Sequence, residues 1–155
     1  MSIQQSFITL SDGNVIPQLG LGVWQATQEQ AANAVSEAIK SGYRHVDTAS
    51  VYENEDGVGI GIKQSGIARE EVFVTTKVWE TEQGYEPTLR AFGQSQQKLG
   101  LEFVDLYLIH WPVAGHRKDT WQALERLNRV SDAELAARGL TRDGEIRRIM
   151  GVSGF

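Results

Sequence analysis

The stretch Tyr43-Arg44-His45-Val46-Asp47-Thr48 decides the fold, because this strand-like run leads directly into a helical stretch over residues 54–64. The same unit recurs, with strand-like runs at 71–77 and 103–110 that lead into helical stretches at 87–99 and 120–127. Strands that alternate with helices at a spacing of roughly 30 residues are typical of βα units in a parallel sheet. We therefore expect an α/β fold with parallel strands.

Shorter runs complete the pattern on both sides. Residues 7–10 and 15–17 flank an Asp-Gly turn and predict an N-terminal β-hairpin, in which Pro17 limits the second run to an edge or a strand end. Residues 19–24 predict a short buried strand, and a helical stretch begins at Thr27 and ends at Ser41-Gly42. Residues 146–153 are the last strand candidate.

Residues 128–144 depart from this rhythm. From His110 to Ser153 the chain advances 43 residues, against 33 from Lys77 to His110. Ser131-Asp132-Ala133-Glu134 has the form of a capping box and predicts an additional short helix over 133–138. We expect a single partial (β/α) domain over 1–155, with 128–144 as an atypical helical insertion.

The composition excludes several classes of function. The 155 residues include no cysteine and carry a formal net charge of −5, so disulfide and thiolate chemistry is excluded and a nucleic-acid partner is not expected. No apolar run approaches the roughly 18 residues of a membrane span, and the start lacks the order of a secretory signal, so we expect a cytoplasmic protein without a membrane partner. The three histidines, at 45, 110 and 116, lack metal-ligand spacing, so no metal site is expected.

Polar residues end four successive strand candidates, namely Asp47, Lys77, His110 and Ser153, and Tyr52 follows in the loop after the first of them. In parallel βα architectures the reactive groups collect at the carboxyl ends of the strands, so we expect these side chains to converge on one rim. Each of them also has an ordinary structural interpretation, such as a helix cap or a solvated lysine. Only their joint placement favours a functional site.

These residue types suit proton transfer to an oxygen that gains negative charge. A free tyrosine has a pKa of about 10 and is a poor acid, but a neighbouring ammonium stabilises the phenolate that it leaves. A carboxylate keeps that lysine charged, and a neutral histidine can donate a hydrogen bond to a substrate oxygen. The set suits carbonyl reduction, and an organic cofactor would have to carry the hydride.

Two further motifs have more than one interpretation. Trp24, Trp79 and Trp111 lie at or just after strand ends, where they would either wall a substrate pocket or pack helices against strands. Gly57-Val58-Gly59-Ile60-Gly61 is rich in glycine but lacks the strand, G-x-G-x-x-G and helix order of a dinucleotide fingerprint.

Taken together, several motifs resemble the aldo-keto reductase family, and most closely the bacterial 2,5-diketo-gluconate (methylglyoxal) reductases. They occur in the order of that family and cover nearly the whole chain: Asp12-Gly13-Asn14, Ile16-Pro17-Gln18-Leu19-Gly20-Leu21-Gly22, Gly42-Tyr43-Arg44-His45-Val46-Asp47-Thr48-Ala49, Tyr52-Glu53-Asn54-Glu55, Thr75-Thr76-Lys77-Val78-Trp79, Asp105-Leu106-Tyr107-Leu108-Ile109-His110-Trp111-Pro112 and Gly151-Val152-Ser153-Gly154-Phe155.

The resemblance implies a TIM-type (β/α) barrel, of which about the first five strands are expected here, and NADPH-dependent reduction of aldehydes or ketones such as keto-sugar acids. It makes Tyr52 the proton donor, supported by Lys77 and Asp47, and His110 the residue that orients the substrate carbonyl. It places the substrate against His110, Trp24, Trp79 and Trp111, and NADPH against Gly22, Val23, Trp24, Asp47 and Ser153.

The sequence departs from the family pattern in three respects, one of which is the insertion over residues 128–144 described above. Gly154 stands where the family usually has asparagine. The chain has 155 residues, whereas a complete (β/α)₈ barrel takes about 250. An inactive half-barrel that serves as a binding or assembly unit therefore stays open as an alternative. The open barrel edge would favour self-association, and NADPH affinity is expected to be weak.

Overall fold

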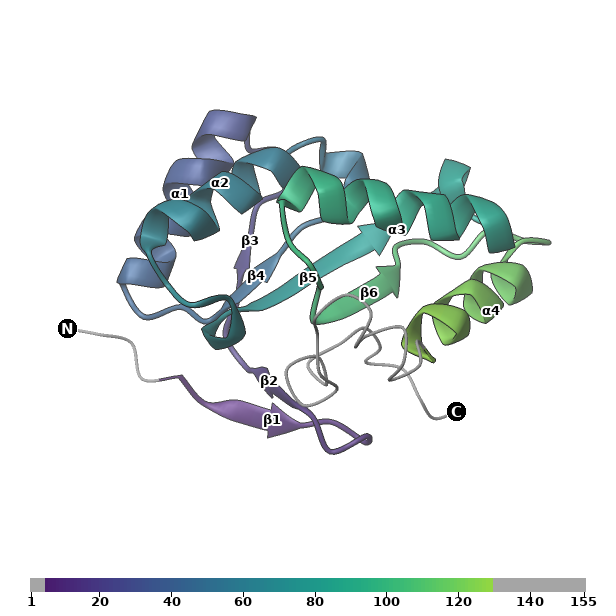
Figure 1. Ribbon diagram of the computed structural model, residues 1–155, viewed down its shortest axis with the longest axis horizontal. Coiled ribbons are helices and arrows are strands. Elements are labelled where there is room, and N and C mark those ends of the chain that lie inside the picture. The colour runs from purple at the N-terminus through teal and green to yellow at the C-terminus, as the bar shows by residue number, and fades with distance from the viewer. Residues whose placement is uncertain (1–4, 130–155) are drawn as a thin grey trace.

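The computed structural model describes residues 5–129, and its centre is a parallel four-stranded sheet (Figure 1). The sheet has the order β3-β4-β5-β6, so that strands adjacent in sequence are also adjacent in space. Its strands are β3 (Leu21–Gly22), β4 (His45–Asp47), β5 (Phe73–Val78) and β6 (Leu106–Ile109). The expected N-terminal hairpin is present as a separate antiparallel pair, β1 (Phe7–Thr9) and β2 (Val15–Pro17).

Helices connect the strands of the sheet and give each pair of strands a βα crossover. Three helices lie side by side along one face of the sheet, and the fourth lies beside the edge strand β6 (Figure 1). They are α1 (Gln28–Lys40), α2 (Glu55–Ser65), α3 (Tyr85–Leu99) and α4 (Arg117–Asn128). Single 3₁₀ turns precede α2, β5 and α3, at Ser50–Tyr52, Arg69–Glu71 and Glu80–Glu82.

Local sequence signals explain where these helices begin and end. Thr27 caps α1 in a reciprocal capping box with Gln30, which satisfies two backbone N–H groups that the first turn would leave unpaired. Gly66 and Gly100 follow α2 and α3 in the left-handed conformation that a glycine adopts without a steric penalty. Helices α2 and α3 therefore end within one residue of the ends of the helical stretches expected at 54–64 and 87–99.

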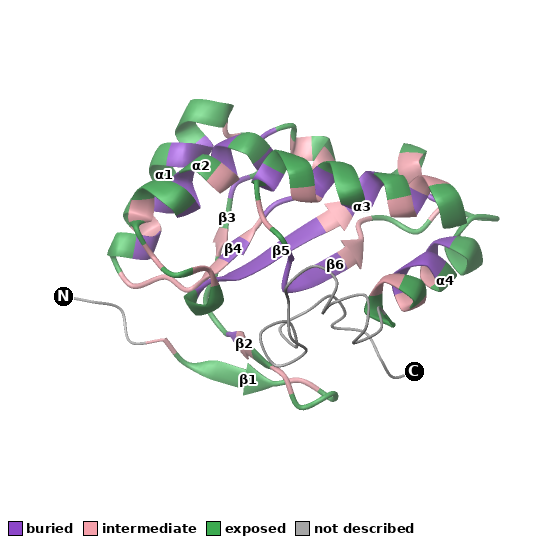
Figure 2. Cartoon of the chain, viewed as in Figure 1, coloured by how far each residue is buried: buried purple, intermediate pink, exposed green. Residues whose placement is uncertain are grey.

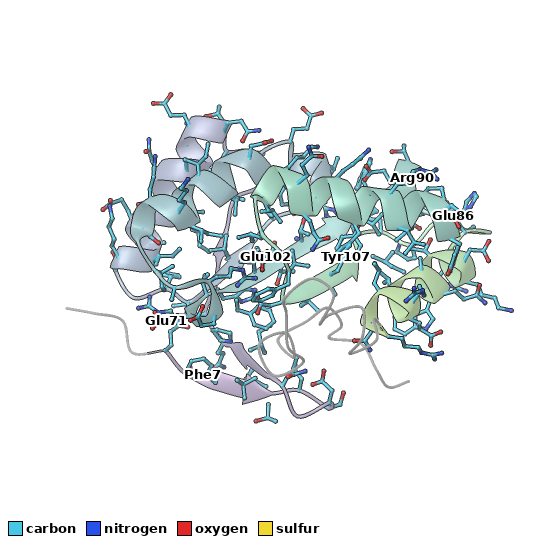
Figure 3. The ribbon with its side chains drawn as sticks, in the orientation of Figure 1. Phe7, Glu71, Glu86, Arg90, Glu102 and Tyr107 are labelled. Atoms are coloured by element: carbon cyan, nitrogen blue, oxygen red, sulfur yellow. The ribbon has the colours of Figure 1, made fainter. Side chains whose placement is uncertain are left out.

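The core lies between the sheet and the inner faces of the helices (Figure 2). The sheet contributes Val46, Val74 and Val78, none of which has any exposed surface. Tyr107 of β6 is also buried, with its ring centroid 5.0 Å from that of Phe92 on α3 (Figure 3). Aromatic contact at this distance and inclination packs α3 against the edge strand β6.

The glycine-rich run of α2 is explained by helix packing and not by phosphate binding. A Cβ atom on Gly57 would lie 2.2 Å from the carbonyl oxygen of Gln28 in α1, and one on Gly59 would lie 2.1 Å from the carbonyl oxygen of Leu99 in α3. On Gly61 it would lie 2.5 Å from the oxygen of Ala32. The glycines therefore allow α2 to pack against the backbones of both neighbouring helices.

A buried ion pair joins the starts of β5 and β6, at the end of the sheet opposite the predicted site. Asp105 accepts hydrogen bonds from the Arg69 guanidinium (2.5 Å) and from the backbone N–H of Val74 (2.8 Å). Arg69 also lies 4.0 Å from the ring centroid of Phe103 and donates to the carbonyl of that residue. Charged hydrogen bonds of this kind fix the register of two neighbouring strands.

The elements predicted within residues 5–129 are confirmed, with some differences in extent. The run 19–24 contains a strand of only two residues, because Leu19 and Trp24 are exposed and Gln25 turns the chain with a positive φ of 63°. Helices α3 and α4 begin earlier than expected, at Tyr85 and Arg117. Within 128–144, Asn128 ends α4, whereas the helix expected at 133–138 and the strand expected at 146–153 fall outside the described residues. No helix in the part of the chain that the structure describes could cross a membrane.

Candidate active site

The carboxyl ends of β4 and β5 bring together an ion pair. The Nζ atom of Lys77 donates to Oδ1 of Asp47 at 2.6 Å and to the backbone carbonyl of Thr48 at 2.8 Å. The lysine side chain is 12% exposed and the aspartate 35%, so one side of the pair faces the core and the other remains open. The pairing holds the ammonium group at the rim, close to where a substrate oxygen could be reached.

Tyr52 lies beside this ion pair, on the 3₁₀ turn that follows β4. The ammonium nitrogen of Lys77 is 5.1 Å from the centroid of the Tyr52 ring, which is within the range of a cation–π interaction. The Tyr52 ring also meets the His110 ring edge to face, with centroids 5.5 Å apart and an interplanar angle of 80°. The tyrosine ring therefore contacts both a cation and an imidazole.

His110 follows β6 directly, and its backbone N–H donates to the carbonyl of Val78 at 3.1 Å. Its ring also contacts Trp79 edge to face, at 5.3 Å between centroids. Partial burial, and after it the positive charge of Lys77, lowers the pKa of His110 below its ordinary value. The imidazole is therefore neutral at pH 7 and can offer one N–H donor at the rim.

The three tryptophans predicted to line a pocket occupy different environments. Trp79 is partly buried against His110, whereas Trp24 and Trp111 are 69% and 62% exposed. The exposed ring faces of Trp24 and Trp111 are available for contact with a ligand. Ser153, the remaining predicted rim residue, lies outside the described residues.

The end of β3 leaves open space beside the ion pair. Gly22 pairs with Asp47 across the sheet, is exposed, and would have no atom within 4 Å of an added Cβ. Val23 is buried, and its N–H donates to the carbonyl of Asp47 at 3.3 Å. A flat group such as a nicotinamide could approach the backbone of Gly22 here, so this strand end could hold the reactive end of a dinucleotide.

Two site residues, Thr48 and Asn54, were not singled out by sequence analysis. Both are fully buried beneath the rim, and the Thr48 hydroxyl donates to the Asn54 side-chain oxygen at 3.0 Å. Their only signal in the sequence was their place beside Asp47 and Tyr52, because nothing in the local pattern distinguishes a buried amide from a solvated one. Among the residues that the structure describes, no cluster of His, Asp and Glu could hold a metal ion.

Comparisons with known proteins point to one family. A model of the aldo/keto reductase family matches residues 18–155. The glyoxal reductase of Bacillus subtilis (strain 168) is 50% identical over 149 residues, which make up 96% of this chain and 49% of that protein. The chain thus spans about half the length of this curated relative.

Solved structures show the same fold. An aldo/keto reductase from Brucella melitensis superposes with a TM-score of 0.79 at 47% identity, over 89% of this chain and 60% of that one. A Bombyx mori aldo-keto reductase in complex with NADP superposes with a TM-score of 0.75 at 38% identity, over 82% and 48%. The sheet with its N-terminal hairpin therefore corresponds to part of their barrels, and the chain belongs to the aldo/keto reductase family.

Proposed function

We propose that this chain provides the catalytic groups for NADPH-dependent reduction of aldehydes and ketones to alcohols, with Tyr52 as the proton donor. The observation that supports this most directly is that the Tyr52 ring contacts both the Lys77 ammonium and the His110 ring. A hydroxyl so placed can give its proton to a carbonyl oxygen while the ammonium stabilises the negative charge that remains.

Each residue has a distinct part in this reaction. Asp47 holds Lys77 at 2.6 Å and keeps its charge directed to the rim. Neutral His110 donates a hydrogen bond to the carbonyl oxygen and turns it toward Tyr52. Bound NADPH would supply the hydride, which is chemistry that no side chain can provide. Tyr52 then transfers its proton to the oxygen, and the product is an alcohol.

The cofactor would be held by Gly22, Val23, Trp24 and Asp47, and by Ser153 from outside the described residues. The open space over Gly22 supports this assignment, since a glycine at the end of a strand lets a ligand approach the backbone closely. The substrate would contact His110, Trp24, Trp79 and Trp111. Exposed aromatic rings around a few polar groups suit a small carbonyl compound, such as a dicarbonyl or a keto-sugar acid.

The test begins with the chain as it exists, in a size-selected and folded sample. Titration with NADPH should quench tryptophan fluorescence in a saturable way, and small aldehydes and keto acids should then be reduced with loss of absorbance from NADPH. Tyr52→Phe should keep the fold and the NADPH binding but lose turnover by about 10²-fold or more. Turnover that survives in Tyr52→Phe would contradict the proton-donor role.

The edge of the sheet supports a second candidate, a binding or assembly unit. In the described part of the chain no strand pairs with the outer side of β6, and a hollow of about 420 Å³ lies next to it. The hollow is lined by Ile109, Pro112, Arg117, Lys118 and Trp121. An unpaired edge beside apolar side chains favours self-association. Light scattering that finds only monomers would exclude this candidate in its self-associating form.

A further inference from the structure

We propose that Asn54 is a positioning residue that fixes Tyr52 relative to the loop formed by residues 22–26. This inference rests on the function proposed above, because it assigns a purpose to the distance between the proton donor and the cofactor-binding backbone. Two segments carry these groups: the 22–26 loop after β3, and the Tyr52 turn, residues 49–53, after β4.

Asn54 directly follows the Tyr52 turn, and its side chain binds the 22–26 loop and Thr48, the residue just before that turn, with all the polar atoms of its amide. Its Nδ2 donates to the carbonyls of Val23 at 2.8 Å and Ala26 at 3.0 Å, and its Oδ1 accepts from the Thr48 hydroxyl at 3.0 Å. Asn54 has no exposed surface. An unpaired polar group at such depth destabilises the fold, so the loss of any of these three hydrogen bonds would be unfavourable.

Both segments contain a backbone conformation that needs support. Gln25, within the 22–26 loop, has a φ of 63°, and Glu53, the last residue of the Tyr52 turn, has a φ of 54°. These are the non-glycine residues with positive φ among those the structure describes. Such a conformation is unfavourable for a residue with a Cβ and persists only where surrounding contacts hold it. Asn54 binds the carbonyls on both sides of Gln25 and directly follows Glu53 in the chain.

The same amide is linked to the ion pair of the site. Thr48, which donates to Asn54, accepts a hydrogen bond from the Lys77 ammonium through its backbone carbonyl at 2.8 Å. A shift of Asn54 would therefore move the 22–26 loop, Tyr52 and the Thr48 carbonyl that binds Lys77 together. Gln28 of α1 supports the Tyr52 turn independently, through the carbonyl of Glu53 at 2.8 Å.

The test is Asn54→Asp, measured by hydrogen–deuterium exchange of the whole chain. This change keeps the shape but places a carboxylate oxygen against two carbonyls. The amides of Ala26, Tyr52 and Glu53 are hydrogen-bonded within the two segments. They should exchange at least about tenfold faster, in both segments together, because the net stabilisation of one or two hydrogen bonds is lost. Asn54→Ala, which removes the same donors without adding charge, serves where the aspartate variant does not fold.

The matched control is Thr120→Val. Thr120 is also fully buried, and its hydroxyl joins the N–H of Gly84 to the carbonyl of His116, at 2.9 Å each, away from Tyr52. This variant should leave exchange in both segments unchanged. Wild-type exchange in both segments of the Asn54 variants, or an increase spread evenly through β5 and α1, would overturn the positioning role.

An activity measurement separates this proposal from the proposed function. Where the wild-type chain reduces carbonyls, Asn54→Ala should lower kcat at least about tenfold and change the substrate KM little, since the rim contacts remain. Unchanged kcat alongside faster exchange would overturn the link to catalysis. A folded wild-type chain without turnover would refute the proposed function, and the exchange measurement would still decide whether Asn54 positions the two segments.

Discussion

Replacing Gly59 by alanine tests whether the backbone contact between α2 and α3 sets the packing of the helices. The added Cβ would lie 2.1 Å from the carbonyl oxygen of Leu99, whereas ordinary contact begins near 3.4 Å. The two helices would have to separate by the difference, 3.4 − 2.1 = 1.3 Å. A backbone oxygen cannot rotate away as a flexible side chain can, so the strain spreads into the packing between the helices.

The free energy of unfolding should fall despite the better helix propensity of alanine. Overpacking of this kind costs about 1–3 kcal/mol or more, and replacing glycine by alanine inside a helix returns about 1 kcal/mol. We expect the free energy of unfolding to fall by about 1–2 kcal/mol. The value should be about 2 kcal/mol, because the clash is with a backbone atom. Urea unfolding followed by circular dichroism gives this difference from the shift of the midpoint.

Gly93 provides the matched control on α3 itself. It is exposed, and a Cβ there would meet no atom within 4 Å. Gly93→Ala should therefore raise the free energy of unfolding by about 0.5–1 kcal/mol, which is the propensity gain without the clash. If Gly59→Ala were as stable as the wild type while Gly93→Ala behaved as expected, the backbone contact would not determine how α2 and α3 pack.

Three other changes test the ion pairs and a buried carboxyl. Asp105→Ala should destabilise the fold by about 3–5 kcal/mol in urea unfolding, because it leaves Arg69 without its buried partner; a loss below 1 kcal/mol would show that the pair contributes little. Burial raises the pKa of Glu55 above its usual 4.5, so the folded state holds this proton to higher pH than the unfolded state does. The stabilisation from the protonated Glu55 carboxyl is present below pH 4.5 and is lost as the pH rises through the raised pKa. Between pH 4.5 and 7, the free energy of unfolding of Glu55→Gln should therefore rise relative to that of the wild type. A difference between the two proteins that stays constant over this pH range would contradict this. Lys77→Met should reduce carbonyl turnover by about 10²-fold or more while Asp47 stays in place, as kinetics and circular dichroism would show, and near wild-type turnover would exclude Lys77 from the reaction.

The order of the elements could be predicted from the sequence because helix-ending glycines and the periodicity of apolar residues are local features. Gly66 and Gly100 mark helix ends, and the apolar runs around Val46 and Val74 mark buried strands. The convergence of Asp47, Lys77 and His110 also followed, because parallel strands place their carboxyl ends on one edge. The structure brings these three together with Tyr52, as the contacts at the rim show.

Features that depend on distant contacts could not be predicted in this way. The strand expected at 19–24 is only two residues long in the structure. The apolar residue types in this run do not reveal that Leu19 and Trp24 are exposed. The purpose of Gly57 and Gly59 depends on two other helices, and that of Asn54 on carbonyls 31 and 28 residues away. Such roles arise only when the chain has folded, so no local signal carries them.

The Arg69–Asp105 pair lies at the starts of β5 and β6, and Lys77 and His110 lie at their other ends. The interactions that hold these strands in register are thus separated by the length of the strands from the groups proposed to carry the chemistry. Trp24 and Trp111 are mostly exposed, so their replacement removes little buried area. Both positions could be randomised together in a library for new carbonyl substrates, with most variants keeping a folded scaffold.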